Sequence, residues 1–141
     1  MKSFFSKKQH VSLLILLLFI VSAIMFSCEK DEEIPPVMEL KTGAEYVSTD
    51  LTLPRDTTIT VGVTVEKTED DLKTFNVSVA YDGSSTTTTK LNEDLTGDQK
   101  TGFNADIDLQ TRNQAGTEKW YFTVTDVDGN IVQEVLTFTV N

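Results

Sequence analysis

The sequence predicts an all-β fold, an antiparallel β-sandwich of about seven short strands. From residue 37 onward apolar residues recur at every second position, the period of a strand with one buried face, and no stretch shows a convincing helical period. Turn-forming residues divide these stretches about every 8 to 12 residues. Residues 37–141 are enough for one hydrophobic core and too few for two, so we expect one domain.

The expected strands in the first half of the domain differ in how clearly they alternate. Residues 39–41 and 47–53 are short candidates, and Pro54 must lie at an edge or in a turn because it has no N–H to donate. Residues 57–67 and 74–82 alternate throughout, so each should bury one face. Their inward residues are expected to be Ile59, Val61, Val63 and Val65, and Phe75, Val77, Val79 and Tyr81.

The second half begins with four threonines at 86–89, a β-branched run that we expect to form an edge strand ended by Lys90. Residues 102–110 alternate again. Residues 119–141 are expected to form an antiparallel hairpin, because the Asp128-Gly129 pair between its two halves favours a tight reversal. The inward residues of these strands are expected to be Phe103, Ala105, Ile107 and Leu109, then Trp120, Phe122 and Val124, then Leu136, Phe138 and Val140.

This strand number and spacing are typical of an immunoglobulin-like sandwich. Residues 120–130, which read Trp-Tyr-Phe-Thr-Val-Thr-Asp-Val-Asp-Gly-Asn, resemble the last hairpin of the Ig-like, cadherin-like and PKD-like modules of bacterial surface lipoproteins. In the C-terminal part the resemblance rests on this motif, and in the rest of the domain it rests only on the strand pattern. The cysteine pair of antibody domains is missing, so the resemblance implies an architecture and no activity.

The N-terminus reads as an export signal. Lysines precede an apolar run at 11–26, which at 16 residues is shorter than the roughly 20 that a membrane-spanning helix needs. We therefore expect residues 1–27 to be a cleaved signal peptide, with an uncleaved N-terminal anchor as the alternative. Cleavage would fall between Ser27 and Cys28. Cys28 is the only cysteine of the chain, and a lone thiol at a cleavage site predicts modification of its sulfur.

The tripeptide Phe26-Ser27-Cys28 resembles a bacterial lipobox of the looser Bacteroidetes type, which implies a diacylglycerol on Cys28. The acidic run Glu29, Lys30, Asp31, Glu32 and Glu33 resembles the signal that sends lipoproteins of that group to the outer face of the outer membrane. A solvated, disordered tether is the alternative reading of this run. Residues 28–36 form the expected tether, because the run ends in two prolines that favour an extended spacer.

Composition excludes several functions for the chain that begins at Cys28. It keeps 9 Lys+Arg against 22 Asp+Glu, a formal net charge of −13, so we expect no nucleic-acid partner. The only histidine, His10, lies in the expected signal peptide. Without histidine or a free thiol there is no Ser-His-Asp or Cys-His machinery and no ordinary zinc site, and we expect neither a metal nor a cofactor.

Three acidic groupings are candidate sites. Residues 126–130 superficially resemble a calcium loop, but Gly129 is fourth and Thr137 twelfth where an EF-hand needs glycine sixth and glutamate twelfth, so a hairpin turn is expected. Paired carboxylates at 69–71 and at Asp106 and Asp108 could in principle cleave a glycosidic bond. Residues 69–71 lie in an expected loop, and Asp106 and Asp108 lie on a polar strand face, so both groups are expected on the solvated surface.

Aromatic and hydroxyl side chains give the remaining candidates. Trp120 could stack on a sugar, but its alternation with Phe122 favours the core. Tyr46 and Tyr121 are expected to face outward and are the candidate ligand contacts. The tripeptide at 56–58 resembles the O-glycosylation acceptor motif of Bacteroidetes-type exported proteins, with Thr57 as the acceptor, and a plain turn is the alternative.

Together these features predict a non-enzymatic lipoprotein of the cell envelope, lipid-anchored in the outer membrane and exposed on the cell surface. Its Ig-like domain would act in adhesion or as an accessory or scaffold in an envelope complex. The alternative is a small glycan-binding lipoprotein that assists polysaccharide uptake. The expected partners are the membrane, through the lipid, and a protein or a glycan.

Overall fold

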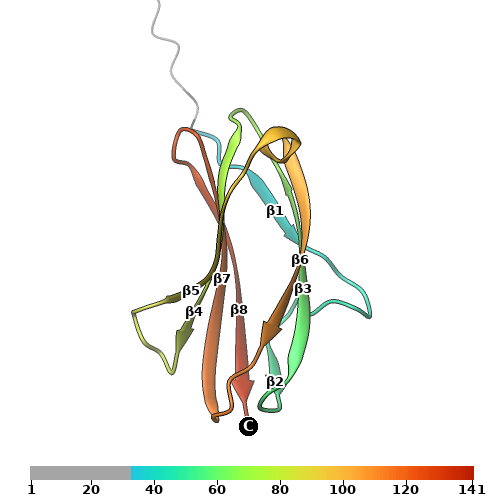
Figure 1. Ribbon diagram of the computed structural model, residues 1–141, viewed down its shortest axis with the longest axis vertical. Coiled ribbons are helices and arrows are strands. Elements are labelled where there is room, and N and C mark those ends of the chain that lie inside the picture. Colours follow the sequence, from blue (N-terminus) through green and yellow to red (C-terminus); the bar gives the residue numbers. More distant parts are fainter. Residues whose placement is uncertain (1–32) are drawn as a thin grey trace, which may run out of the picture. The chain divides into compact units, whose positions relative to one another are not determined.

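The computed structural model describes residues 33–141, which form two β-sheets packed face to face (Figure 1). One sheet has three strands in the order β1-β3-β6, and the other has five in the order β2-β8-β7-β4-β5. All neighbours pair antiparallel except β2 and β8, which are parallel. The elements are β1 Val37–Leu40, β2 Leu51–Leu53, β3 Thr58–Glu66, β4 Leu72–Tyr81, β5 Thr88–Asp94, the 3-10 helix η1 Gly97–Lys100, β6 Gly102–Gln110, β7 Gly116–Asp126 and β8 Ile131–Val140.

The strand order is that of an immunoglobulin-like sandwich. The first, third and sixth strands share one sheet, as strands A, B and E do in that fold, and β8, β7, β4 and β5 correspond to G, F, C and C′ in the other. The predicted all-β, Ig-like architecture is therefore confirmed. Eight strands are present among the described residues, where about seven were expected.

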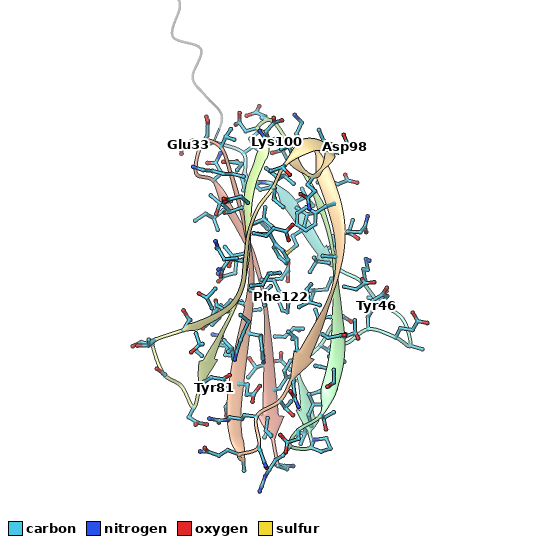
Figure 2. The ribbon with its side chains drawn as sticks, viewed as in Figure 1. Glu33, Tyr46, Tyr81, Asp98, Lys100 and Phe122 are labelled. Atoms are coloured by element: carbon cyan, nitrogen blue, oxygen red, sulfur yellow. The ribbon has the colours of Figure 1, made fainter. Side chains whose placement is uncertain are left out.

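The core lies between the sheets and follows the predicted alternation. Trp120, Phe122 and Val124 of β7 are buried, and Figure 2 shows Phe122 between the two sheets. Burial of alternate residues removes apolar area from water on one face of each strand. The other buried core residues include Val61, Val63 and Val65 of β3, Phe75, Val77 and Val79 of β4, Leu109 of β6, and Leu136, Phe138 and Val140 of β8.

Three expected strand limits were wrong. β5 continues through Lys90 to Asp94, because its backbone pairs with β4 while the lysine side chain remains exposed at the sheet edge. Its position as an edge strand is confirmed. β1 begins at Val37. β2 is confined to Leu51–Leu53, and before it Val47 makes a single backbone bond, from its N–H to the carbonyl of Thr60 (2.9 Å).

Thr68 fixes the point at which the chain enters the domain. Its hydroxyl donates to the carbonyls of Ile34 (2.9 Å) and Pro35 (3.2 Å), and Pro36 is buried. This entry lies at one end of the sheets, while the C-terminus lies at the other (Figure 1). The expected signal peptide, Ser27, Cys28 and residues Glu29, Lys30, Asp31 and Glu32 of the acidic run lie outside the described residues. No helix within residues 33–141 is long and apolar enough to cross a membrane.

Candidate functional site

Tyr46 lies in the loop between β1 and β2, over the outer face of the three-stranded sheet (Figure 2). It is half-buried. Its hydroxyl donates to Oδ2 of Asp106 (3.2 Å), and Oδ1 of the same carboxylate accepts from Nζ of Lys41 (2.7 Å). The Lys41 ammonium lies 5.4 Å from the Tyr46 ring centroid, within reach of a cation–π attraction. Tyr46 is thus held by two neighbours and is a poor free platform for a ligand.

Gly62 of β3 leaves space for the side chains of Lys41 and Tyr46. A Cβ at position 62 would lie 2.6 Å from Cδ of Lys41 and 2.9 Å from Cδ1 of Tyr46, so any larger residue would displace both side chains. The hydrogen bond from Lys41 is the main reason that the pKa of Asp106 lies below its ordinary value, and it also raises the pKa of Lys41. Both groups therefore remain charged at neutral pH.

Asp106 and Asp108 do not act as a carboxylate pair. Asp106 is bound to Lys41 and Tyr46, and Oδ1 of Asp108 accepts from the hydroxyl of Thr60 on β3 (2.7 Å). Both lie on the exposed outer face of β6. A glycosidase needs two carboxylates that flank an enclosed bond, so this arrangement suits a solvated sheet face.

Tyr121 lies at the centre of the outer face of the five-stranded sheet. It is the sixth of eleven residues of β7, the third strand of the five, and its cross-strand neighbours are Ser78 and Val135. The Lys119 ammonium lies 5.5 Å from its ring centroid. The structure therefore places Tyr46 and Tyr121 on different sheets and does not bring them together. Most residues on the same face of the three central strands are uncharged, although Ser78 and Ala80 among them are buried. The charged residues nearest this face are Lys119 on β7, the exposed Lys73 on β4, and Asp94 of β5, which lies opposite Thr74.

Glu118 is a buried carboxylate that the sequence reasoning missed. It faces the core from β7 with 0% exposure. Oε2 accepts from the indole N–H of Trp120 (3.1 Å) and Oε1 from the backbone N–H of Arg112 (2.9 Å), with Nε of Arg112 3.7 Å from Oε1. Its position two residues before Trp120 could have identified it, because residues two apart on a strand share a face. Its bonds join the loop after β6 to the core.

Arg112 links this buried acid to the surface. Its Nη2 pairs with Oδ1 of Asp82, and its guanidinium lies 4.9 Å from the ring centroid of Tyr81 at the end of β4. Oδ1 of Asp82 also accepts from the backbone N–H of Thr117 (3.0 Å). The Arg112 bond first, and then the Thr117 bond, lowers the pKa of Asp82. These contacts hold the ends of β4 and β7 together.

The loop at 126–130 is a hairpin turn built around Asp126, as predicted. Oδ1 of this buried carboxylate accepts from the backbone N–H groups of Asp128 (3.0 Å), Gly129 (2.8 Å) and Asn130 (2.8 Å). Oδ2 accepts from the side-chain amide of Asn130 (3.0 Å). Gly129 has a φ of 96°, which favours glycine. Asp126 thus caps the turn with its oxygens, where a calcium loop would turn them toward the ion.

The acidic loop at 69–71 lies beside this turn. Asp71 pairs with Nζ of Lys67 (2.8 Å), which is the main cause of its lowered pKa, and its carbonyl accepts from the backbone N–H of Val127 (2.9 Å). Desolvation, followed by repulsion from Asp128 and Asp126, raises the pKa of Asp70. Within residues 33–141 no three acidic, cysteine or histidine side chains are grouped so that they could hold a metal ion.

Thr57 lies in the turn that joins β2 to β3. Its side chain is half-buried, and its hydroxyl donates to the carbonyl of Arg55 (3.4 Å). Its backbone N–H donates to the hydroxyl of Thr111 (2.9 Å), which itself donates to the carbonyl of Pro54 (2.9 Å). Asp56 has a φ of 52°, in the left-handed region. The residue expected as a glycan acceptor is thus part of an ordered turn.

No family model matches the chain, and no curated protein matches it. The solved structures that resemble it include the complex of human zinc 2-glycoprotein with prolactin inducible protein, at 7% identity and a TM-score of 0.49, over 80% of this chain and 99% of that one. Murine CRIg resembles it at 13% identity and a TM-score of 0.40, over 75% of this chain and 98% of that one. A β-glucosidase of Listeria innocua gives 14% identity and a TM-score of 0.45, and the 74% of this chain that matches spans 16% of the enzyme. At these values the likenesses assign no function.

Proposed function

We propose that this chain is a non-enzymatic lipoprotein of the bacterial cell envelope, anchored in the outer membrane by a lipid on Cys28 and exposed on the cell surface. Its Ig-like domain acts in adhesion or as an accessory or scaffold in an envelope complex. The observation that carries this proposal is that the two buried carboxylates have structural roles. Glu118 and Asp126 serve to hold the sandwich together, and the outer faces remain for contact with a partner.

Fatty-acid labelling tests the anchor. Cells that express the full chain should incorporate labelled palmitate into it, and Cys28→Ala should abolish the label, because Cys28 is the only residue that can form the thioether. Replacement of residues 29–33, the acidic run with its one lysine, by alanine should keep the lipid and lose accessibility to protease on intact cells. Unchanged labelling of Cys28→Ala would contradict the lipoprotein proposal.

The alternative, glycan binding in polysaccharide uptake, is favoured by one observation. Tyr121 stands at the centre of a sheet face whose middle strands carry hydroxyl and amide side chains beside it, with Lys119 as its nearest charge. Aromatic rings on such faces can stack on apolar surfaces of a ligand while the polar side chains donate and accept hydrogen bonds. Binding to saccharides, and its loss in Tyr121→Ala, separates the two functions.

A further inference from the structure

Four strands lie at sheet edges, and three of these edges are short or interrupted. β1 and β2 have four and three residues, and the pairing of β5 with β4 shifts register between Val77 and Ser78. β6 has nine residues, all paired with β3 without a register shift, and no other described strand pairs with it. Because short strands and bulges are the usual protection of a sheet edge, β6 is the least protected edge of this domain.

Alternate residues of β6 present free backbone groups at this edge. Beyond the two ends of the β3–β6 ladder, Lys67 N–H donates to the carbonyl of Thr101 (3.2 Å) and Thr111 N–H donates to the carbonyl of Thr57 (2.9 Å). Successive residues of a strand direct their backbone groups to opposite sides, so the odd-numbered residues of β6 bond to β3. The N–H and C=O groups of the even-numbered residues, Asn104, Asp106 and Asp108 among them, therefore point to the open edge.

The apolar side chains next to this edge are incompletely covered. Phe103, Ala105 and Ile107 face the core from β6, yet all three are only partly buried, whereas Val61 and Val63 on the adjacent β3 have 0% exposure. The difference arises because no strand of residues 33–141 lies beyond β6 in its sheet. An added strand would cover these side chains and would also bond to the free backbone groups.

The charges on β6 determine which kind of added strand could pair with it. Asp106 and Asp108 stand two residues apart on the outer face of this edge, and the Asp106 side chain is 51% exposed despite its pairing with Lys41. Antiparallel pairing with a second copy of β6 in a central register would set aspartate against aspartate, which is destabilising. Lysine or arginine at alternate positions of an incoming strand would instead meet opposite charges.

We propose that β6 is a docking edge for an extended basic segment of a partner protein, which adds as a fourth strand to the β1-β3-β6 sheet. Backbone bonds at Asn104, Asp106 and Asp108 hold the segment, and its inward residues cover Phe103 and Ile107. Its outward lysines or arginines lie beside the two aspartates. This inference rests on the proposed function as a protein-binding module, and it names the surface and the chemistry of the partner.

Synthetic peptides test the proposal on the full chain in detergent micelles, with fluorescence anisotropy as the readout. The probe is a labelled peptide of alternating lysine and valine. The controls are a peptide with the same residues in two blocks and one of alternating glutamate and valine. We expect the alternating basic peptide to bind at least about tenfold more tightly than either control, and to weaken as salt is raised.

Two substitutions at Asn104, whose backbone N–H points to the open edge, provide matched variants. Asn104→Pro removes a free N–H and no bond to β3, whereas Asn104→Ala keeps that N–H. Both lose the bond that the Asn104 side chain accepts from Thr64 (2.9 Å), so the loss of the side chain is common to the two variants. We expect Asn104→Pro to reduce affinity about tenfold or more and Asn104→Ala to bind as the unchanged chain does. Circular dichroism should show that both variants fold.

A second variant keeps the proposal testable if the proline variant does not fold. Asp108→Asn keeps every backbone group and the acceptor for Thr60, so it should lower both the affinity for the basic peptide and its salt dependence. Equal binding of the block peptide, or unchanged binding by a folded Asn104→Pro, would overturn the proposal. Self-association that Asn104→Pro abolishes would assign the edge to a second copy and overturn it as well. The labelling of Cys28 does not involve β6, so the anchor is tested separately.

Discussion

The indole N–H of Trp120 donates to a carboxylate oxygen of Glu118 (3.1 Å) on the inward face of the same strand. Trp120 has 2% exposure and Glu118 has 0%. A carboxylate in a protein interior is costly unless its oxygens are bonded. Here the indole and the backbone N–H of Arg112 bond its two oxygens, and Nε of the Arg112 guanidinium lies 3.7 Å from Oε1 as a counter-charge. The pair therefore joins the apolar core to the loop after β6, at the residue next to the buried Thr111.

Truncation of the indole should be strongly destabilising. We expect Trp120→Ala to lower the free energy of unfolding by about 3 to 5 kcal/mol, because it opens a cavity in the core. Trp120→Phe should cost less, although it leaves an oxygen of Glu118 without its donor. Urea unfolding followed by circular dichroism measures both. A negligible loss in Trp120→Ala would instead indicate an exposed platform.

Removal of the buried acid should also be costly. Glu118→Ala leaves two N–H donors without an acceptor and a guanidinium without its buried counter-charge, and we expect a loss of about 3 to 5 kcal/mol. Glu118→Gln retains an acceptor oxygen and should lose less. The same unfolding measurement applies. Equal stability of Glu118→Ala and the unchanged chain would show that the carboxylate is not needed to hold the loop.

Asp126 should be required for the last hairpin without any metal. Asp126→Ala removes the acceptor of three backbone N–H groups, and we expect a loss of about 2 kcal/mol or more. Asp126→Asn keeps an acceptor oxygen and is the matched control. Since both oxygens are already bonded, added calcium should leave the thermal midpoint of the unchanged chain where it is. A rise of several degrees with calcium would restore the calcium-loop reading.

Asp82 should contribute to acid unfolding. Its pKa in the folded chain lies below the ordinary 3.8, because Arg112 and the N–H of Thr117 stabilise the carboxylate. The stabilisation is therefore complete above pH 3.8 and is lost as the pH falls through the lowered value. We expect Asp82→Asn to be less stable at neutral pH and to depend less on pH below this point. A parallel pH profile for the two proteins would contradict this role.

The two tyrosines should behave differently if the domain binds glycans. Both tyrosines are half-buried with a lysine near the ring, but the hydroxyl of Tyr46 also bonds to Asp106, whereas Tyr121 stands at the centre of a sheet face. On a glycan array we expect no saccharide to bind the unchanged chain with micromolar affinity. A saccharide that binds, and is lost in Tyr121→Ala but retained in Tyr46→Ala, would favour the glycan-binding alternative over adhesion or assembly.

The sequence predicted well those strands that bury one face and expose the other. Residues 102–110 coincide with β6, and β3, β4, β7 and β8 lie close to their predicted limits, because burial on one face imposes a period of two. β5 was harder to bound, since it is exposed along nearly all of its length and therefore lacks that period. Its extent is set by its pairing with β4, which a local pattern does not contain.

The side-chain networks were less accessible from the sequence. Alternation places Glu118 and Asp126 on the inward face of β7, but it does not say what compensates a buried charge. The partner of Glu118 comes from the loop after β6, and that of Asp82 from a residue 30 positions away. Tyr46 was expected to be open to a ligand, and only the tertiary structure shows that Lys41 and Asp106 occupy its surroundings.

The parallel pairing of β2 with β8 determines how the domain would respond to mechanical force. The chain enters at one end of the sheets and leaves at the other (Figure 1), and β2 runs in the same direction as the last strand. Tension between Glu33 and Asn141 would pull these two strands along their length in opposite directions. The hydrogen bonds between them, and the bond from Asn141 N–H to the carbonyl of Leu53 (3.1 Å), would then be loaded together in shear and would have to break at nearly the same time.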